Sequence, residues 1–122
     1  MVVDAIHGDQ LREHGGLPGV RDENALESAL VRPQQEWHYD ADNDVPRSAA
    51  AYAFGLVKNH PYRDGNKRIG FLAMVTFLGV NGHTFEASDA EVVARFVSLA
   101  AGKVSEDGLT DWIRSHSSPA RR

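Results

Sequence analysis

The chain has 122 residues, of which 42% are hydrophobic and 25% are charged, so we expect residues 1–122 to form a single globular domain. A formal net charge of −4 excludes the overall basic field of a nucleic-acid-binding domain, and the lack of cysteine excludes disulfides and thiolate zinc sites. The first residues lack the pattern of a signal peptide, and the longest apolar stretch, Ile69–Val80, is too short to span a bilayer, so we expect a cytoplasmic protein.

The first part of the chain predicts two helices and a polar connection. Val2–His14 has the pattern of a short amphipathic helix. Asp22 is a suitable N-cap for a second helix, Glu23–Arg32, whose apolar residues share one face. Pro33 should end that helix, because proline has no N–H to donate and clashes with the preceding turn. Residues 34–46 are mostly polar, and we expect them to form a mobile loop or a small hairpin.

The remainder of the chain predicts four more helices and only weak strand signals. Arg47–Lys58 and Asn66–Asn81 are apolar on most sides, which indicates two buried helices. Ser88 opens a capping box for a fifth helix that runs to about Ala101, and Ser105 is a suitable cap for a sixth. We expect the tail, residues 117–122, to be frayed. The predicted fold class is all-α.

Between the two buried helices lies the stretch HPYRDGNKR, residues 60–68, where polar and charged side chains are crowded. Gly65 can adopt backbone angles closed to other residues and allows a ligand to approach closely. The helix that follows presents its first N–H groups there, and a helix start is a natural anion site. Lys67 and Arg68 would oppose the helix dipole unless an anion is bound beside them, and phosphate suits both side chains.

Two further residues of this stretch carry groups suited to chemistry on a phosphate ester. Asp64 beside a phosphate site suggests a hard divalent cation, most simply Mg²⁺. His60 has the side chain best suited to accept a proton from a hydroxyl near neutral pH. Together the residues suggest transfer of a phosphate ester to an alcohol. They also fit an ordinary turn, in which the histidine caps a helix and the cations are solvated.

The same stretch resembles the signature of the Fic/Doc family, and specifically that of its Doc (death-on-curing) branch. Fic members read roughly HPFxxGNGRxxR, and Doc members read roughly HxFx(D/N)xNKR. The residues that match the Doc form are His60, Asp64, Asn66, Lys67 and Arg68, with Tyr62 in the aromatic position. The flanking segments GVRDENALESALVRP (19–33) and FLGVNGHTFEAS (77–88) are also similar to Doc segments, so the resemblance covers nearly the whole chain.

The resemblance implies a compact all-α bundle of about six helices, with the signature in a loop between two central helices. His60 would be the base that deprotonates a Ser or Thr hydroxyl of a target, and Asp64 would hold Mg²⁺. Tyr62 would be a buried anchor, and the polar segment 34–46 would be a flap that aligns the target. The phosphates of ATP would contact Gly65, Asn66, Lys67 and Arg68.

Two departures from the Fic form bear on which phosphate is transferred. Lys67 stands where Fic members have glycine, and Phe71 stands where they have an arginine that holds the distal phosphates during AMP transfer. These differences favour the Doc reaction, transfer of the ATP γ-phosphate, which makes a protein kinase. AMP transfer on the same fold is the first alternative. The second is a catalytically silent module that binds an antitoxin and acts as a corepressor.

The resemblance also implies partners. The protein substrate would be elongation factor Tu, whose modification blocks translation. The chain would be the toxin of a type II toxin–antitoxin pair, and a Phd-type antitoxin would cover the site with its C-terminal segment. No Ser or Thr in the chain has Glu four positions later, so the self-inhibitory S/T-x-x-x-E pattern of some Fic proteins is absent from the sequence. We expect no membrane contact, and contact with nucleic acid only through the antitoxin–operator complex.

Overall fold

The computed structural model describes residues 21–39, 44–61 and 65–119. Within these ranges the chain forms five helices and two short strands, so the predicted helical fold is confirmed. In chain order the elements are α2 (Glu23–Tyr39), α3 (Val45–Asn59), α4 (Asn66–Val80), β1 (His83–Phe85), α5 (Asp89–Ala100), α6 (Glu106–His116) and β2 (Ser117–Pro119). The helix predicted at Val2–His14 lies outside the described residues. No helix among the described ones is long and apolar enough to cross a membrane.

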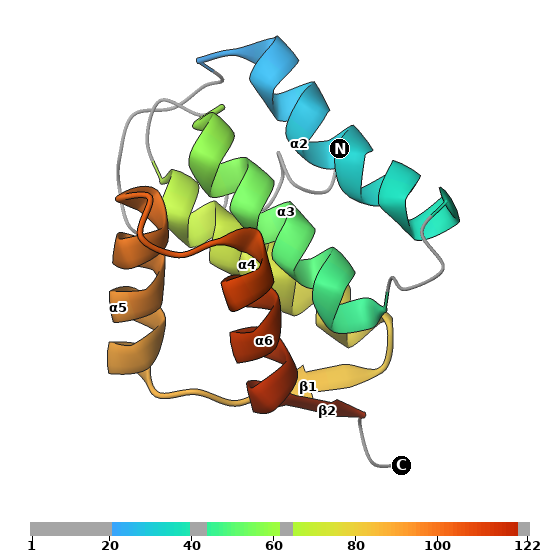
Figure 1. Ribbon diagram of the computed structural model, residues 1–122, viewed down its shortest axis with the longest axis vertical. Coiled ribbons are helices and arrows are strands. Elements are labelled where there is room, and N and C mark those ends of the chain that lie inside the picture. The colour runs from blue at the N-terminus through green and yellow to red at the C-terminus, as the bar shows by residue number, and fades with distance from the viewer. Residues whose placement is uncertain (1–20, 40–43, 62–64, 120–122) are drawn as a thin grey trace.

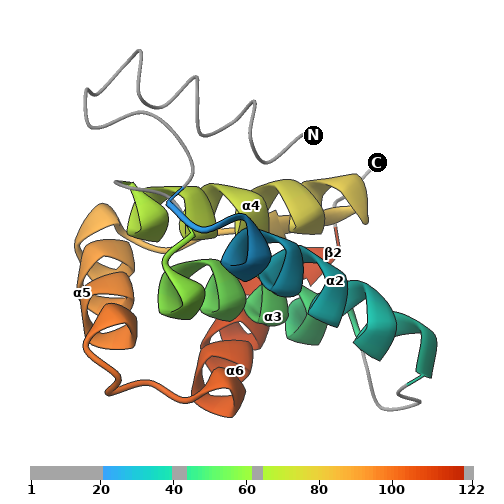
Figure 2. The ribbon, with the colours of Figure 1, turned by 90° about the horizontal axis from the view of Figure 1, so that it is seen from above.

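Helix α3 lies at the centre of the fold and contacts α2, α4, α5 and α6. Figure 1 shows α2 along one side of α3, with α5 and α6 on the other side. In Figure 2 α4 and α6 lie on opposite sides of α3. The alanines of α3 are buried, and their small side chains allow neighbouring helices to approach it from several directions. The predicted burial of this helix is therefore confirmed.

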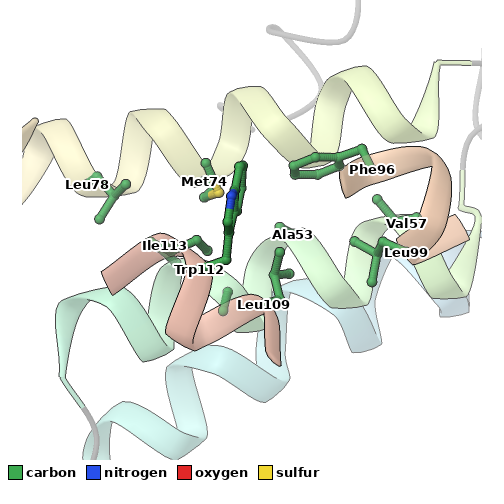
Figure 3. Close-up of a cluster of buried hydrophobic side chains, with 11 residues drawn as sticks. Ala53, Val57, Met74, Leu78, Phe96, Leu99, Leu109, Trp112 and Ile113 are labelled. Carbon is green, nitrogen blue, oxygen red and sulfur yellow. The ribbon is translucent and has the colours of Figure 1, made fainter. Parts of the chain in front are cut away.

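The core consists of two clusters of buried side chains, and α3 contributes to both. The larger cluster joins α3 and α4 to α5 and α6, as Figure 3 shows. Met74 and Leu78 of α4, Leu99 of α5 and Ile113 of α6 are fully buried in it. The smaller cluster joins α2 to α3 and α4 through Leu26, Ala29, Leu30, Leu56, Ile69 and Ala73. Because burying one large aliphatic side chain contributes about 1.5–3 kcal/mol, the clusters fix α3 and α4 relative to each other.

Helices α3 and α4 approach each other closely at Gly70. A Cβ atom at this position would lie 2.8 Å from Cγ2 of Val57 and 3.3 Å from the carbonyl oxygen of Ala53. Both distances are shorter than ordinary contact, and the branched side chain of valine has little freedom to move away. The missing side chain at Gly70 therefore allows α4 to lie directly on the last turns of α3.

The helix starts predicted from capping residues are confirmed. Asp22, Ser88 and Ser105 each accept a hydrogen bond from the backbone N–H three residues later, at 3.0, 3.1 and 2.9 Å respectively. These contacts satisfy N–H groups that have no partner inside the helix. Helix α4 also begins at the predicted residue, Asn66.

Helix α2 is longer than predicted. It runs from Glu23 to Tyr39 and continues through Pro33, which is fully buried. A proline inside a helix costs about 3 kcal/mol, because it removes a hydrogen bond and crowds the preceding turn. The apolar face of α2 packs on α3 and α4, and this burial outweighs the local penalty. The predicted helix end at Arg32 and the predicted loop or hairpin at 34–39 are therefore wrong.

Helix α3 begins two residues before its predicted start, at Val45. Asp44 is its N-cap, and Oδ1 of this residue accepts a hydrogen bond from the backbone N–H of Arg47 at 3.0 Å. Pro46 lies in the first turn, where a missing N–H removes no helical hydrogen bond. The predicted loop is therefore wrong at this end as well, and residues 40–43 lie outside the described ones.

The end of the chain forms a strand where fraying was predicted. β2 (Ser117–Pro119) pairs antiparallel with β1 (His83–Phe85), which follows α4. The ring of Phe85 lies 5.3 Å from that of Trp112, so the pairing is reinforced by packing on α6. Three-residue strands are too short to be recognised from local sequence, and they form here because two helix ends bring them together. Residues 120–122 lie outside the described part of the chain.

Gly70→Ala should lower the free energy of unfolding by about 1–3 kcal/mol, because the added methyl group overpacks the contact with α3. Gly79→Ala is the matched control, since it lies in the same helix and its added Cβ would have nothing within 4 Å. The control should raise the free energy of unfolding by up to about 1 kcal/mol, the usual gain on replacing glycine in a helix. Urea unfolding measures both, and equal effects would contradict the close contact at Gly70.

Asp44 connects the start of α3 to α6, and its ionisation is coupled to folding. Its two carboxylate oxygens accept hydrogen bonds from Nη2 of Arg114 at 3.0 and 2.7 Å. Partial burial pushes the pKa of Asp44 upward, but the Arg114 side chain and the Arg47 N–H outweigh this and hold the pKa below its ordinary value of 3.8. The stability from ionised Asp44 is therefore complete above that value and is lost as the pH falls below it.

Asp44→Ala should lower the free energy of unfolding by about 0.5–2 kcal/mol at neutral pH, because the helix cap and the ion pair are both lost. Asp44→Asn keeps a capping oxygen and should cost about 0–1 kcal/mol, since the ion pair is exposed to solvent. Asp111→Asn is the control, because Asp111 pairs with Arg114 at 3.5 Å from inside α6. Urea unfolding at about pH 7 and about pH 3 should show the Asp44→Asn deficit shrinking in acid. A deficit that grows in acid would contradict the direction of the pKa shift.

Candidate active site

The turn from α3 to α4 has a left-handed backbone residue at each of its described ends. His60 is the C-cap of α3, with φ 52° and ψ 52°, and it is exposed. Gly65 is the N-cap of α4, with φ 79°, a conformation that glycine adopts without steric cost. The predicted metal ligand Asp64 and the predicted anchor Tyr62 lie outside the described residues, so both assignments stay predictions.

A pocket of about 330 Å³ opens at this turn. It lies where the end of α3, the start of α4 and the end of α5 meet. These three helix ends lie toward the upper left of Figure 1. Its lining residues are Val57, His60, Gly65, Asn66, Lys67, Arg68 and Ala100. The structure therefore brings five of the six predicted site residues to one pocket, and the sixth is Asp64.

The start of α4 has the features of an anion site. Its N-cap, Gly65, makes no side-chain capping hydrogen bond, and the first turn carries no acidic residue. Lys67 and Arg68 are exposed in that turn, whereas Asn66 is buried. Peptide N–H groups point out of the helix end, so the helix dipole and both cations favour a negative charge in the pocket. An arginine fork beside a lysine point charge suits the oxygens of a phosphate chain.

The beginning of α2 holds the histidine end of the turn. Nε of Arg21 donates a hydrogen bond to the carbonyl oxygen of His60 at 2.7 Å, and Nη2 donates one to that of Asn59 at 3.1 Å. The backbone N–H groups of Arg21 and Asp22 both donate to the carbonyl oxygen of Pro61, at 2.7 and 3.0 Å. Four donors thus converge on three successive carbonyl groups.

Sequence reasoning missed Arg21, although a signal was present. A cation immediately before the N-cap of a helix opposes the helix dipole, and the same conflict singled out Lys67 and Arg68. The carbonyl groups at the end of α3 resolve the conflict at Arg21, because they attract a cation. Ala100 was also missed, and no local pattern marks an alanine at the end of α5 as part of a pocket.

Phe71 belongs to the core and does not line this pocket. Its ring lies 5.7 Å from that of Phe96 and 6.1 Å from that of Phe85, with both pairs in edge-to-face contact. It packs against the larger cluster between α4 and α5. The position at which a Fic protein would present a further arginine therefore carries an apolar side chain that is directed into the fold.

Within the described ranges, no group of three or more His, Asp and Glu side chains is arranged to hold a metal ion. The predicted magnesium site rests on Asp64, which these ranges do not include. The residues around the pocket therefore fit a phosphate group directly, and the fit to Mg²⁺ depends on a carboxylate outside the described part of the chain.

Comparison with known proteins agrees with this arrangement. Residues 2–78 match the Fic/DOC family. The chain is 29% identical over 111 residues to Protein kinase doc of Escherichia phage P1, covering 90% of this chain and 86% of that protein. It is 42% identical over 69 residues to Toxin Doc of Mycolicibacterium smegmatis, covering 56% of this chain and 53% of that protein. Since the family match spans more than half of the sequence and includes the turn that joins His60 to the start of α4, the chain belongs to the Fic/Doc family.

Proposed function

We propose that this chain is the toxin of a type II toxin–antitoxin pair and a protein kinase that transfers the γ-phosphate of ATP to a Ser or Thr hydroxyl of elongation factor Tu. The observation that carries the proposal is one pocket lined both by an exposed histidine and by the cationic start of a helix. The names of the two relatives, a protein kinase and a toxin, support it.

In the proposed reaction His60 accepts the proton of the target hydroxyl. The hydroxyl oxygen forms a bond to the γ-phosphorus, the bond from that phosphorus to the β–γ bridging oxygen breaks, and ADP leaves. The start of α4 neutralises charge on the phosphate chain through its N–H groups and through Lys67 and Arg68. Gly65 leaves room for the phosphates to approach the helix end, because it has no side chain.

Transfer of the γ-phosphate is favoured over AMP transfer by two residues. Lys67 places bulk and charge at the first turn of α4, where Fic members have glycine. Phe71 is packed against Phe85 and Phe96, so that position supplies no cation for distal phosphates. ATP would therefore be held in a different orientation from the one that AMP transfer requires.

Mg²⁺ is proposed as the metal that accompanies ATP, with Asp64 as its protein ligand. A bound Mg²⁺ would neutralise phosphate charge and orient the nucleotide. A carboxylate one residue before Gly65 suits this role by residue type and by its place in the sequence.

A Phd-type antitoxin is proposed as the partner that silences the site by covering it with its C-terminal segment. The relative named Toxin Doc supports a toxin role, and such a toxin needs an inhibitor in its own host. Because elongation factor Tu is a cytoplasmic protein, the proposed place of action is the cytoplasm.

The test of the proposed function uses purified protein, Mg²⁺, elongation factor Tu and ATP labelled on either the γ- or the α-phosphate. Label should reach the target from the γ-phosphate only, and chelation of Mg²⁺ should stop the transfer. Label from the α-phosphate would mean AMP transfer and would overturn the argument from Lys67 and Phe71. Absence of label from either position, with folded protein, would reject elongation factor Tu as the substrate and would leave either a different target or a silent antitoxin-binding module.

His60→Ala should reduce the rate of transfer by at least about 100-fold, the usual effect of losing a general base. ATP affinity, measured by calorimetry, should stay close to that of the unchanged protein, because the phosphate contacts come from α4. His83→Ala is the control, since His83 lies in β1 beyond the other end of α4. Transfer that persists in the His60 variant would remove His60 from the role of base.

A further inference from the structure

We propose that Arg21 is a positioning residue for His60, and that it sets the rate of the chemical step without contacting ATP or the target hydroxyl. This inference rests on the proposed function in one respect, the role of His60 as the base. Arg21 itself lies just before α2, outside the pocket lining, and it contacts the backbone on which His60 is carried.

His60 has a left-handed backbone conformation, which is uncommon and strained for a residue other than glycine. Among the described residues it is the only one other than glycine with a positive φ. The left-handed conformation places Cβ too close to the following carbonyl oxygen, so surrounding contacts must hold it. Pro61 makes it unfavourable for α3 simply to continue through His60, because a residue before proline is disfavoured in the α-helical region.

The contacts that hold this conformation come from the start of α2. Arg21 donates to the carbonyl oxygens of His60 and Asn59 through its side chain and to that of Pro61 through its backbone. These carbonyl groups at the end of α3 have no partner within the helix. The hydrogen bonds to the carbonyl groups of Asn59 and His60, at 3.1 and 2.7 Å, hold the peptide groups before and after His60. They therefore oppose rotation about both φ and ψ of that residue.

Arg21 can act as a support because its own position is fixed. Asp22, the next residue, caps α2 by accepting a hydrogen bond from the N–H of Ala25 at 3.0 Å. In the opposite direction, Nδ2 of Asn59 donates to the carbonyl oxygen of Ala25 at 3.1 Å. The end of α3 and the start of α2 therefore bind each other through reciprocal hydrogen bonds, and movement of one would displace the other.

The chemistry of this contact requires arginine. Its planar fork sends two N–H groups from fixed positions toward two neighbouring carbonyl oxygens. Lysine would keep the positive charge, which is favourable at the end of α3, but it has a single nitrogen on a flexible stem. Charge and geometry can therefore be separated by experiment with Arg21→Lys and Arg21→Ala.

The kinetic experiment compares Arg21→Ala, Arg21→Lys and a control, Arg32→Ala, in γ-phosphate transfer to elongation factor Tu. Arg32 also belongs to the α2 region but pairs with Glu106 of α6 at 2.7 Å, away from the turn. Arg21→Ala should lower kcat by about 10–100-fold, the scale expected from a misplaced catalytic group, and leave the KM for ATP nearly unchanged. Arg21→Lys should be more stable to unfolding than Arg21→Ala but should recover little of the lost kcat. Arg32→Ala should leave kcat unchanged.

The double variant Arg21→Ala/His60→Ala separates positioning from a direct role. If Arg21 acts through His60, its loss should have no further effect on the residual rate once His60 is absent. Independent losses that multiply in the double variant would overturn the proposal. Full kcat in either Arg21 variant would overturn it as well.

A spectroscopic measurement keeps the inference separate from the reaction itself. NMR couplings that report the sign of φ at residue 60 should show the left-handed conformation in the unchanged protein and in Arg32→Ala. Arg21→Ala, and to a smaller extent Arg21→Lys, should show it lost or averaged. If the unchanged protein transfers no phosphate, the proposed function fails. The NMR measurement still shows whether Arg21 holds His60 in the left-handed conformation. An unaltered φ in folded Arg21→Ala would overturn the inference.

Discussion

The contact between α3 and α4 is the constraint on which the site depends. The two helices are joined by the short turn that carries His60. Hydrogen bonds from Arg21 and Asp22 hold the histidine end of that turn, and the packing of α4 on α3 holds the other end. Gly70 lets α4 lie against Val57 of α3, one turn before the histidine. The proposed phosphate-binding and proton-accepting groups then lie at the ends of two packed helices, an arrangement that keeps such groups in fixed relative positions.

The two helix ends at the turn have opposite electrostatic character, and the protein uses cations at both. At the end of α3 a cation is favourable, and Arg21 satisfies carbonyl groups there. At the start of α4 cations are unfavourable on their own, yet Lys67 and Arg68 stand in the first turn, which has no acidic residue. The first arrangement stabilises the fold, whereas the second favours a bound anion, in line with the proposed phosphate site.

The strained backbone of His60 and the hydrogen bonds that hold it occur together at this turn. His60 is held in a left-handed conformation, and the elements around it supply the compensating contacts. The aromatic side chain of Phe71 shows the reverse case, because a position that is functional in Fic relatives has become part of the core between Phe85 and Phe96. The same helix therefore carries the proposed anion site at its first turn and ordinary packing one turn later.

The sequence by itself determined the helical class, the caps at Asp22, Ser88 and Ser105, and the identity of the residues around the turn. All of these depend on neighbours a few positions apart, so local chemistry is sufficient to predict them. Tertiary structure decided that α2 continues through Pro33, that Ser117–Pro119 pairs with His83–Phe85, and that Arg21 reaches His60. Each of these depends on burial or hydrogen bonding between segments that only the packed helices bring together. A local pattern can mark an unusual residue, such as a cation before an N-cap, but it does not specify the distant partner.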